Sequence, residues 1–174
     1  ADAMKHDKLL KLVLGALFAA LTCVATMLIH IPMPATNGYI NLGDGMVLLG
    51  AFFLGPAYGF AAGGLGSMLA DLLLGYAAYA PGTFFIKGLT ALVAALVLHA
   101  LSGRLGGLVA GSAAGETVMV LGYFAYEALA LGYGIAAAAS IPGNAIQGAA
   151  GMVVGILAYK ALHAVPGIKK LSHI

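Results

Sequence analysis

Charged side chains stand inside apolar runs of this sequence, where they could bind a ligand or tie helices together. Asp71 lies near the end of the run GGLGSMLADLLLG, and Lys87 lies early in the run TFFIKGLTALVAALVL, with YAPG between the two. A charge at the centre of a bilayer costs at least about 2.5–3.5 kcal/mol on insertion scales, so such residues usually have a role. We expect Asp71 and Lys87 either to pair with each other or to contact a bound molecule.

Other polar side chains are expected on the same, outer side of the membrane as Asp71 and Lys87. Glu116, Tyr123 and Glu127 are seven and four residues apart, which places them on one face of a helix with Glu127 nearest the outer end. A proton path would string ionisable groups across the whole membrane. A cluster confined to one half of the membrane is instead typical of a binding pocket for a small ligand, open to that side. The expected outer cluster consists of Asn37, Tyr39, Asn41, Asp71, Lys87, Tyr123, Glu127, Asn144 and Gln147.

The same residues also have structural interpretations. Asp71 and Lys87 could form a buried ion pair, and Glu127 could bond to Asn144 or Gln147. Asp44 would stand in the first turn of a helix, where a carboxylate suits the helix dipole, and we favour that role for it. Asn41 is a good N-cap for the same helix.

The composition requires these residues to be positioned by membrane-spanning helices. The chain is 62% hydrophobic and 8% charged, and its mean hydropathy is +1.03. Soluble proteins are about 25% charged, so no ordinary soluble surface can be built from this chain. A span takes about 20 apolar residues. We therefore predict an all-α integral membrane protein of six transmembrane helices, with residues 1–174 as a single domain.

The helix limits follow from the turn residues between the apolar runs. The helices are expected at about 9–30, 42–54, 58–79, 83–101, 108–131 and 142–162, and helix 42–54 is short enough to begin within the membrane. The basic residues outside the outer cluster then fall on one side, which predicts that both termini are cytoplasmic. Those residues are Lys5, Lys8, Lys11, Arg104, Lys160, Lys169 and Lys170.

Known catalytic and metal-binding patterns are missing from the sequence. It has no H-E-x-x-H motif, no P-loop and no metal-type Cys/His spacing around its single cysteine, Cys23. We therefore expect no enzyme activity, no cofactor and no metal site. A stand-alone six-helix secondary transporter remains an alternative, although the sequence has no visible inverted repeat or pair of broken helices.

Five segments of the chain carry a family resemblance. The order of NGYINLGDG, FLGPAYGFAAGGLGSMLADLL, YAPGTFFIKGL, MVLGYFAYEAL and IPGNAIQGAAGMVVGILAYKAL resembles the substrate-binding S components of energy-coupling factor (ECF) vitamin transporters. The resemblance extends over nearly the whole chain, from about residue 12 to 162. It is greatest to the S components for vitamin B6 compounds or hydroxymethylpyrimidine, with riboflavin-type members as the alternative.

The resemblance implies a multi-pass protein of the bacterial cytoplasmic membrane that works with partners. These are a transmembrane coupling protein and two cytoplasmic ATPases, and the S component is expected to reorient in the membrane to deliver its vitamin. In the family an A-x-x-x-A pattern contacts the coupling protein, and Ala16 and Ala20 match it here. Gly15 and Ala19 have the same small-xxx-small spacing as Ala16 and Ala20, and internal packing of the bundle is the alternative for both pairs.

The resemblance also places the vitamin site at the first external loop and the outer parts of the last three helices. In this picture Glu127 and Asn144 accept the donors of the ligand, and Tyr123 packs on its ring. Lys87 faces an oxygen of the ligand, and Asp71 holds Lys87 in place. The site residues implied by this match are Tyr39, Asn41, Asp71, Lys87, Tyr123, Glu127, Asn144 and Gln147.

Overall fold

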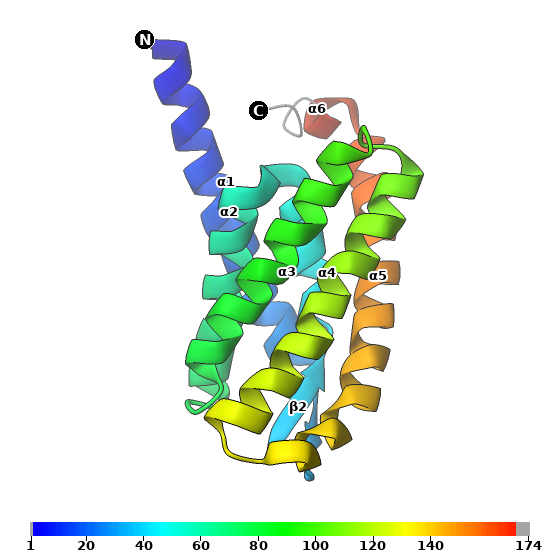
Figure 1. Cartoon of the computed structure of the whole chain (residues 1–174). Helices are drawn as coiled ribbons and strands as arrows, with labels where there is room; N and C mark the ends of the chain where they lie inside the picture. The colour runs from blue at the N-terminus through cyan, green and yellow to red at the C-terminus, as the bar shows by residue number, and fades with distance from the viewer. Residues whose placement is uncertain (1, 170–174) are drawn as a thin grey trace.

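Long helices run side by side through most of the chain (Figure 1). The computed structural model describes residues 2–169. In chain order the elements are α1 (Asp2–Leu28), β1 (His30–Met33), β2 (Gly38–Asn41), α2 (Gly43–Leu74), α3 (Ala80–Ala100), α4 (Leu105–Ala125), η1 (Tyr126–Ala130), η2 (Gly134–Ser140), α5 (Ile141–His163) and α6 (Pro166–Lys169). Five segments in the described part are long and apolar enough to cross a membrane.

The long element α2 accounts for two of the six predicted helices. Gly55 interrupts it with φ of 80° and ψ of −176°, and Pro56 follows. A Cβ on Gly59 would lie 2.9 Å from Cα of Ala51, and one on Gly63 would lie 3.1 Å from Val47. Residues far apart along α2 therefore touch, so segments 43–54 and 56–74 fold back on each other as a helical hairpin. This agrees with the predicted break between helices 42–54 and 58–79.

Apolar side chains cover the outside of the bundle as well as its interior. Leu129 and Ile135 are 85% and 84% exposed, and many other large apolar residues are open on the outer faces of the helices. A soluble protein rarely exposes such an extensive apolar surface, whereas a bilayer covers it at no cost. The structure is consistent with the predicted integral membrane protein.

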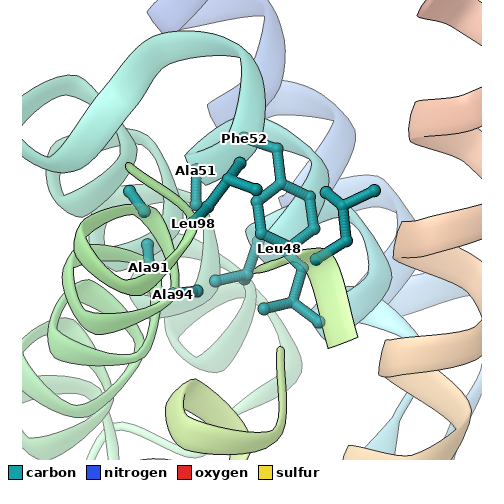
Figure 2. Close-up of a cluster of buried hydrophobic side chains, with 9 residues drawn as sticks. Leu48, Ala51, Phe52, Ala91, Ala94 and Leu98 are labelled. Carbon is teal, nitrogen blue, oxygen red and sulfur yellow. The ribbon is translucent and has the colours of Figure 1, made fainter. Parts of the chain in front are cut away.

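A cluster of apolar side chains forms the core in the half of the bundle nearer to the start of α1. Leu48, Ala51 and Phe52 of α2 pack there against Ala91, Ala94 and Leu98 of α3 (Figure 2). Polar residues of α3 such as Lys87 lie nearer to its beginning, outside this cluster. The core therefore supports the helices from one end and leaves polar residues for the other end.

The segment predicted as the loop 31–43 is a β-hairpin. Strands β1 and β2 pair in antiparallel register, with His30 opposite Asn41 and Met33 opposite Gly38. Asn37 takes a left-handed conformation in the turn, with φ of 54°, which asparagine tolerates better than most residues. The strand was not predicted because the segment IPMP contains two prolines, which argue against a strand. Proline is tolerated on an edge strand, and both strands of this two-stranded sheet are edge strands.

Several predicted helix limits are wrong. The helix expected to reach Tyr79 ends at Leu74, because Gly75 adopts φ of 87° and its N–H bonds back to the carbonyls of the last turn. The next helix begins at Ala80 rather than at the expected residue 83. The helix expected at 108–131 begins at Leu105 and passes into the π-helical turn η1, and residues expected as loop form the 3₁₀ helix η2.

The start of α1, the α3–α4 connection and α6 all lie at one end of the bundle, and the β-hairpin, η1 and η2 lie at the other (Figure 1). Arg104 and Lys169 belong to the first of these ends, and Lys160 is in the last turn of α5 beside it. The predicted separation of basic residues from the outer cluster is therefore present in the fold. Lys170 lies outside the described residues.

Candidate functional site

One internal cavity lies in the half of the bundle that contains the hairpin. It collects side chains from α1, the hairpin, α2, α3, the α4–η1 segment and α5, and all eight predicted site residues line it. The full lining is Thr26, Met33, Gly38, Tyr39, Asn41, Ser67, Asp71, Tyr79, Thr83, Lys87, Tyr123, Glu127, Asn144 and Gln147. Their role in binding remains a prediction, but their convergence on one place is a property of the fold.

Lys87 forms its ion pair with Asp44 and not with Asp71. Both partners are buried, with Lys87 2% exposed and Asp44 0% exposed. The expected Asp71–Lys87 pair is therefore wrong. Asp44 stands in the first turn of α2, as expected, and its carboxylate also bonds Lys87 and Gln147. The physical reason is depth: Lys87 is about two turns inside α3, and α2 begins deep enough in the bundle, after the hairpin, for Asp44 to meet it.

Gln147 connects this ion pair to the hairpin. Its Nε2 donates to Asp44 Oδ2 at 2.6 Å, and its Oε1 accepts the backbone N–H of Asn41 at 2.9 Å. The Asn41 side chain accepts the N–H of Gly43 at 2.8 Å, but the N-cap of α2 is Leu42, so the expected N-cap role of Asn41 is wrong by one residue. These bonds satisfy backbone groups where a strand meets a helix inside the bundle, which makes irregular backbone tolerable at that depth.

Asp71 is held by the hairpin. The Tyr39 hydroxyl donates to Asp71 Oδ1 at 2.5 Å, and the Tyr39 ring packs on Tyr76 with centroids 4.5 Å apart. Burial, and after it the neighbouring Asp71 carboxylate, raise the pKa of the Tyr39 hydroxyl, so this hydroxyl stays protonated and donates. Asp71 is only one turn from the end of α2 rather than the expected two.

Glu127 lies in the π-helical turn η1 and is 1% exposed. Its Oε1 is 2.9 Å from the Tyr79 hydroxyl, and its Oε2 is 2.5 Å from the Ser140 hydroxyl. The expected bond from Glu127 to Asn144 or Gln147 is absent among the described contacts, so that interpretation is wrong. The extra residue of a π turn changes the direction of nearby side chains, and such turns often occur at functional sites.

Tyr123 and Asn144 are the last two of the eight predicted residues that line the cavity. The Tyr123 hydroxyl bonds the Thr83 hydroxyl at 2.9 Å, and its ring centroid is 5.5 Å from Lys87 Nζ. Asn144 is 3% exposed and lines the cavity, yet its side chain makes no hydrogen bond to any described residue. A buried amide of this kind normally has a partner, so Asn144 is available to a ligand.

Several residues at the site were not predicted from the sequence. Tyr79 and Thr83 line the cavity, and Ser140, which does not line it, donates to Glu127. Tyr79 was expected at a helix end on the membrane boundary, and Ser140 was expected in a loop. Neither position gives a sequence signal, because both depend on how the connecting segments fold over Glu127. Asn37 was expected in the cluster but lies exposed at the hairpin turn, where it donates to the Tyr133 hydroxyl at 3.3 Å.

Glu116 lies outside the cavity, at the contact between α4 and α5. It is 4% exposed, and neither of its oxygens has a hydrogen-bond partner in the described part of the chain. Gly148 and Gly151 leave room for it, since a Cβ on either would come within 3.2 Å of the carboxylate. It interacts electrostatically with Asp44 and Lys87.

The cavity is nearly closed. Its free volume is about 20 Å³, which is room for about one water molecule, whereas small-molecule pockets are usually about 300–1,000 Å³. The polar side chains close on one another, so a ligand of vitamin size has to push the lining apart.

The two small-residue pairs of α1 face different ways. Gly15 lies beside Tyr58, and the Ala19 carbonyl packs against Gly66, where a Cβ would be only 2.4 Å away. Ala16 and Ala20 are exposed on the outside of the bundle. The inward pair thus packs α1 on α2, and the outward pair is open to another helix or to lipid.

Comparisons with known proteins agree with this arrangement. The chain matches the family model described as "ECF-type riboflavin transporter, S component" over residues 6–164. It is 38% identical over 132 residues to an uncharacterized protein in a gap 3′ region of Pyrococcus woesei, which covers 76% of this chain and 87% of that protein. A solved S component of a bacterial ECF transporter has the same fold, with a TM-score of 0.66, 22% identity, and coverage of 88% of this chain and 95% of that one.

Proposed function

The chain belongs to the family of S components of ECF-type riboflavin transporters, and from that premise we propose that its polar cavity binds a small ring-containing vitamin or precursor for delivery across the membrane. One observation carries the proposal. Eight polar or aromatic residues, placed by six elements, converge on one buried cavity in one half of a largely apolar bundle. Buried polar groups inside a membrane protein are rarely retained without a role.

The proposed orientation places the cavity on the outer side. Lys8, Lys11, Arg104 and Lys160 are near the opposite end, and cytoplasmic segments carry the excess of Lys and Arg. Both termini are then cytoplasmic, the protein is a multi-pass protein of the cell membrane, and the hairpin faces the side from which the vitamin arrives.

Two substrate groups fit the proposal. The name of the matching family favours riboflavin. The narrow polar cavity favours a smaller ring with hydroxymethyl or amine groups, such as a vitamin B6 compound or hydroxymethylpyrimidine. In either case Glu127 and Asn144 would accept or donate to the ligand, and Tyr123 would pack against its ring.

The proposed energy source lies outside this chain. The family is one of transport subunits and not of enzymes. We propose a transmembrane coupling protein that docks on Ala16 and Ala20, together with two cytoplasmic ATPases. The exposure of these two alanines on α1 supports this surface, because small residues allow close helix approach.

Binding and uptake measurements test the proposal. Purified protein in nanodiscs should bind one of these vitamins at about one molecule per chain in calorimetry. Uptake by cells should require co-expressed ATPases and should survive collapse of the proton gradient. Uptake by this chain alone, driven by the proton gradient, would instead support a secondary transporter.

A further inference from the structure

The buried charges of this protein are unbalanced. Four carboxylates are buried among the described residues, but only one ammonium, that of Lys87, is buried with them. The carboxylates are Asp44, Asp71, Glu116 and Glu127. Removing an ion from water costs several kcal/mol unless a partner compensates it or the group takes up a proton, so these buried carboxyl groups favour a positively charged partner.

Lys87 lines the cavity, but its ion pair is with a carboxylate that lies outside the lining. Its ammonium contacts Asp44, and Gln147 donates to the other oxygen of the same carboxylate. Asp44 does not line the cavity, whereas Asp71 and Glu127 do. Neither carboxylate that faces the cavity forms an ion pair with a described residue, although the Lys87 ammonium acts on Asp71 over a longer distance.

Hydroxyl donors satisfy these carboxylates only in part. Asp71 receives the Tyr39 hydroxyl on one oxygen, while its other oxygen is buried without a well-formed bond. The Thr83 hydroxyl is near enough to Asp71 to interact, but its well-formed hydrogen bond is to Tyr123. Asp71 therefore keeps acceptor capacity that no described side chain fills.

Glu127 is in a similar position, because each of its donors has one proton and two acceptors. The Tyr79 hydroxyl is 2.9 Å from Glu127 but 2.7 Å from the Thr36 carbonyl oxygen. The Ser140 hydroxyl is 2.5 Å from Glu127 and 2.9 Å from the Ala137 carbonyl oxygen. A hydroxyl donates once, so these bonds are shared with the backbone and leave negative charge at the cavity wall.

We propose that the ligand of this cavity is a cation, a small aromatic ring that carries a protonated nitrogen, and that Asp71 and Glu127 hold its N–H groups. The inference rests on the proposed function and narrows its substrate class. Charge-assisted hydrogen bonds to a carboxylate are roughly twice as strong as neutral ones. Asn144, which is buried and has no bond of its own to a described residue, offers a further donor and acceptor to the ring.

A neutral, acceptor-rich ring matches this wall less well. The ring system of riboflavin presents mainly carbonyl oxygens and unprotonated ring nitrogens, which would face carboxylate oxygens without a proton between them. A neutral ligand would also leave both carboxylates uncompensated after the site closes. The chemistry of the wall therefore differs from what the family name suggests.

Matched ligand pairs test the proposal on the unaltered protein. Pyridoxamine and pyridoxine share one ring and differ by an ammonium in place of a hydroxyl, and the aminomethyl and hydroxymethyl forms of the aminopyrimidine differ in the same way. Affinities are measured by calorimetry in nanodiscs, with riboflavin as a neutral fifth probe. We expect the ammonium member of at least one pair to bind about tenfold tighter than its hydroxyl partner.

Two isosteric variants test whether Asp71 and Glu127 cause the preference for the ammonium form. Asp71→Asn and Glu127→Gln keep the size of each side chain and remove its charge, so the preference for the ammonium form should fall in either variant. Thr117→Val is the matched control, because Thr117 is exposed on α4 and bonds only to its own helix at the Ala113 carbonyl oxygen. It should keep the full preference.

The outcomes separate the two proposals. If riboflavin or a hydroxymethyl form binds as tightly as the ammonium forms, the vitamin-binding function stands and the cationic substrate is wrong. If none of the five probes binds, the proposed function fails and this inference fails with it. The ligand pairs decide the matter even if a carboxylate variant does not fold.

Discussion

Lys87 on α3 is paired with Asp44 at the start of α2, while Asp71 is bonded to Tyr39 of the hairpin. Both carboxylates lie near Lys87, but only Asp44 pairs with it, and Asp71 bonds Tyr39 instead. The pair at Asp44 joins two helices and, through Gln147, reaches a third. The bond at Asp71 joins a helix to a strand that covers the cavity. We therefore assign the first to stability and the second to the closing of the site.

The first prediction concerns the buried ion pair. Asp44→Asn leaves the Lys87 ammonium buried without its counter-charge, which should lower the free energy of unfolding by about 3–5 kcal/mol. The double variant Asp44→Asn with Lys87→Met removes both charges and should recover much of that loss. Thermal unfolding in detergent measures both proteins. If the double variant is no more stable than the single one, the pairing assigned to Lys87 is wrong.

This pairing also affects how Lys87→Met alone should be interpreted. That variant leaves Asp44 buried and uncompensated, so lost vitamin binding would not show that Lys87 touches the ligand. The comparison that reports on ligand contact is the double variant against Asp44→Asn.

The second prediction concerns the hairpin. Tyr39→Phe removes the donor to Asp71, and hydrogen bonds to charged groups contribute about 1.5–3 kcal/mol. Hydrogen–deuterium exchange should therefore speed up in residues 30–41 and leave α4 unchanged. Tyr133→Phe is the control, since it removes only the exposed 3.3 Å contact with Asn37 at the hairpin turn. Equal exchange in the two variants would mean that Asp71 does not fasten the hairpin.

The third prediction concerns the two faces of α1. Ala20→Trp lies on the exposed face, so it should abolish uptake with the partner subunits but leave vitamin binding by the isolated protein intact. Ala19→Trp is the comparison, because Ala19 packs next to Gly66 and a large side chain there should lower the melting temperature. Normal uptake with Ala20→Trp would exclude this face as the docking surface.

The fourth prediction concerns close helix packing. A Cβ on Gly66 would lie 2.4 Å from the Ala19 carbonyl oxygen, so Gly66→Ala must push α1 away from α2. Overpacking of this kind costs about 1–3 kcal/mol. Gly106→Ala, where nothing lies within 4 Å, should leave unfolding unchanged or make it slightly harder. A Gly66→Ala protein as stable as the Gly106→Ala protein would contradict the packing described here.

The sequence predicted the helices well because their signal is local. Runs of apolar residues separated by Gly and Pro define each span, and the Gly55-Pro56 break and the Gly59, Gly63 and Gly66 face were visible directly. The confinement of polar residues to one half was visible for the same reason. Helix depth and spacing can be counted along the chain.

The partners of the charged residues could not be predicted by counting positions along the chain. Asp44 reaches Lys87 because the hairpin carries the chain into the bundle before α2 begins, and no local pattern reports that depth. The position of Glu127 depends on a π turn, and its donors Tyr79 and Ser140 come from connections that fold over it. These features arise from tertiary packing, which overrides the local preferences of each segment.

The most direct test of the central claim is mass spectrometry of the small molecules released from the purified protein. We predict a ring-containing vitamin or precursor at about one molecule per chain. It should be lost in a folded Asn144→Ala variant and retained in Thr117→Val. A protein that releases no such compound and binds none of the candidate vitamins, or one whose compound is unaffected by Asn144→Ala, would contradict the assignment of this cavity as the vitamin site.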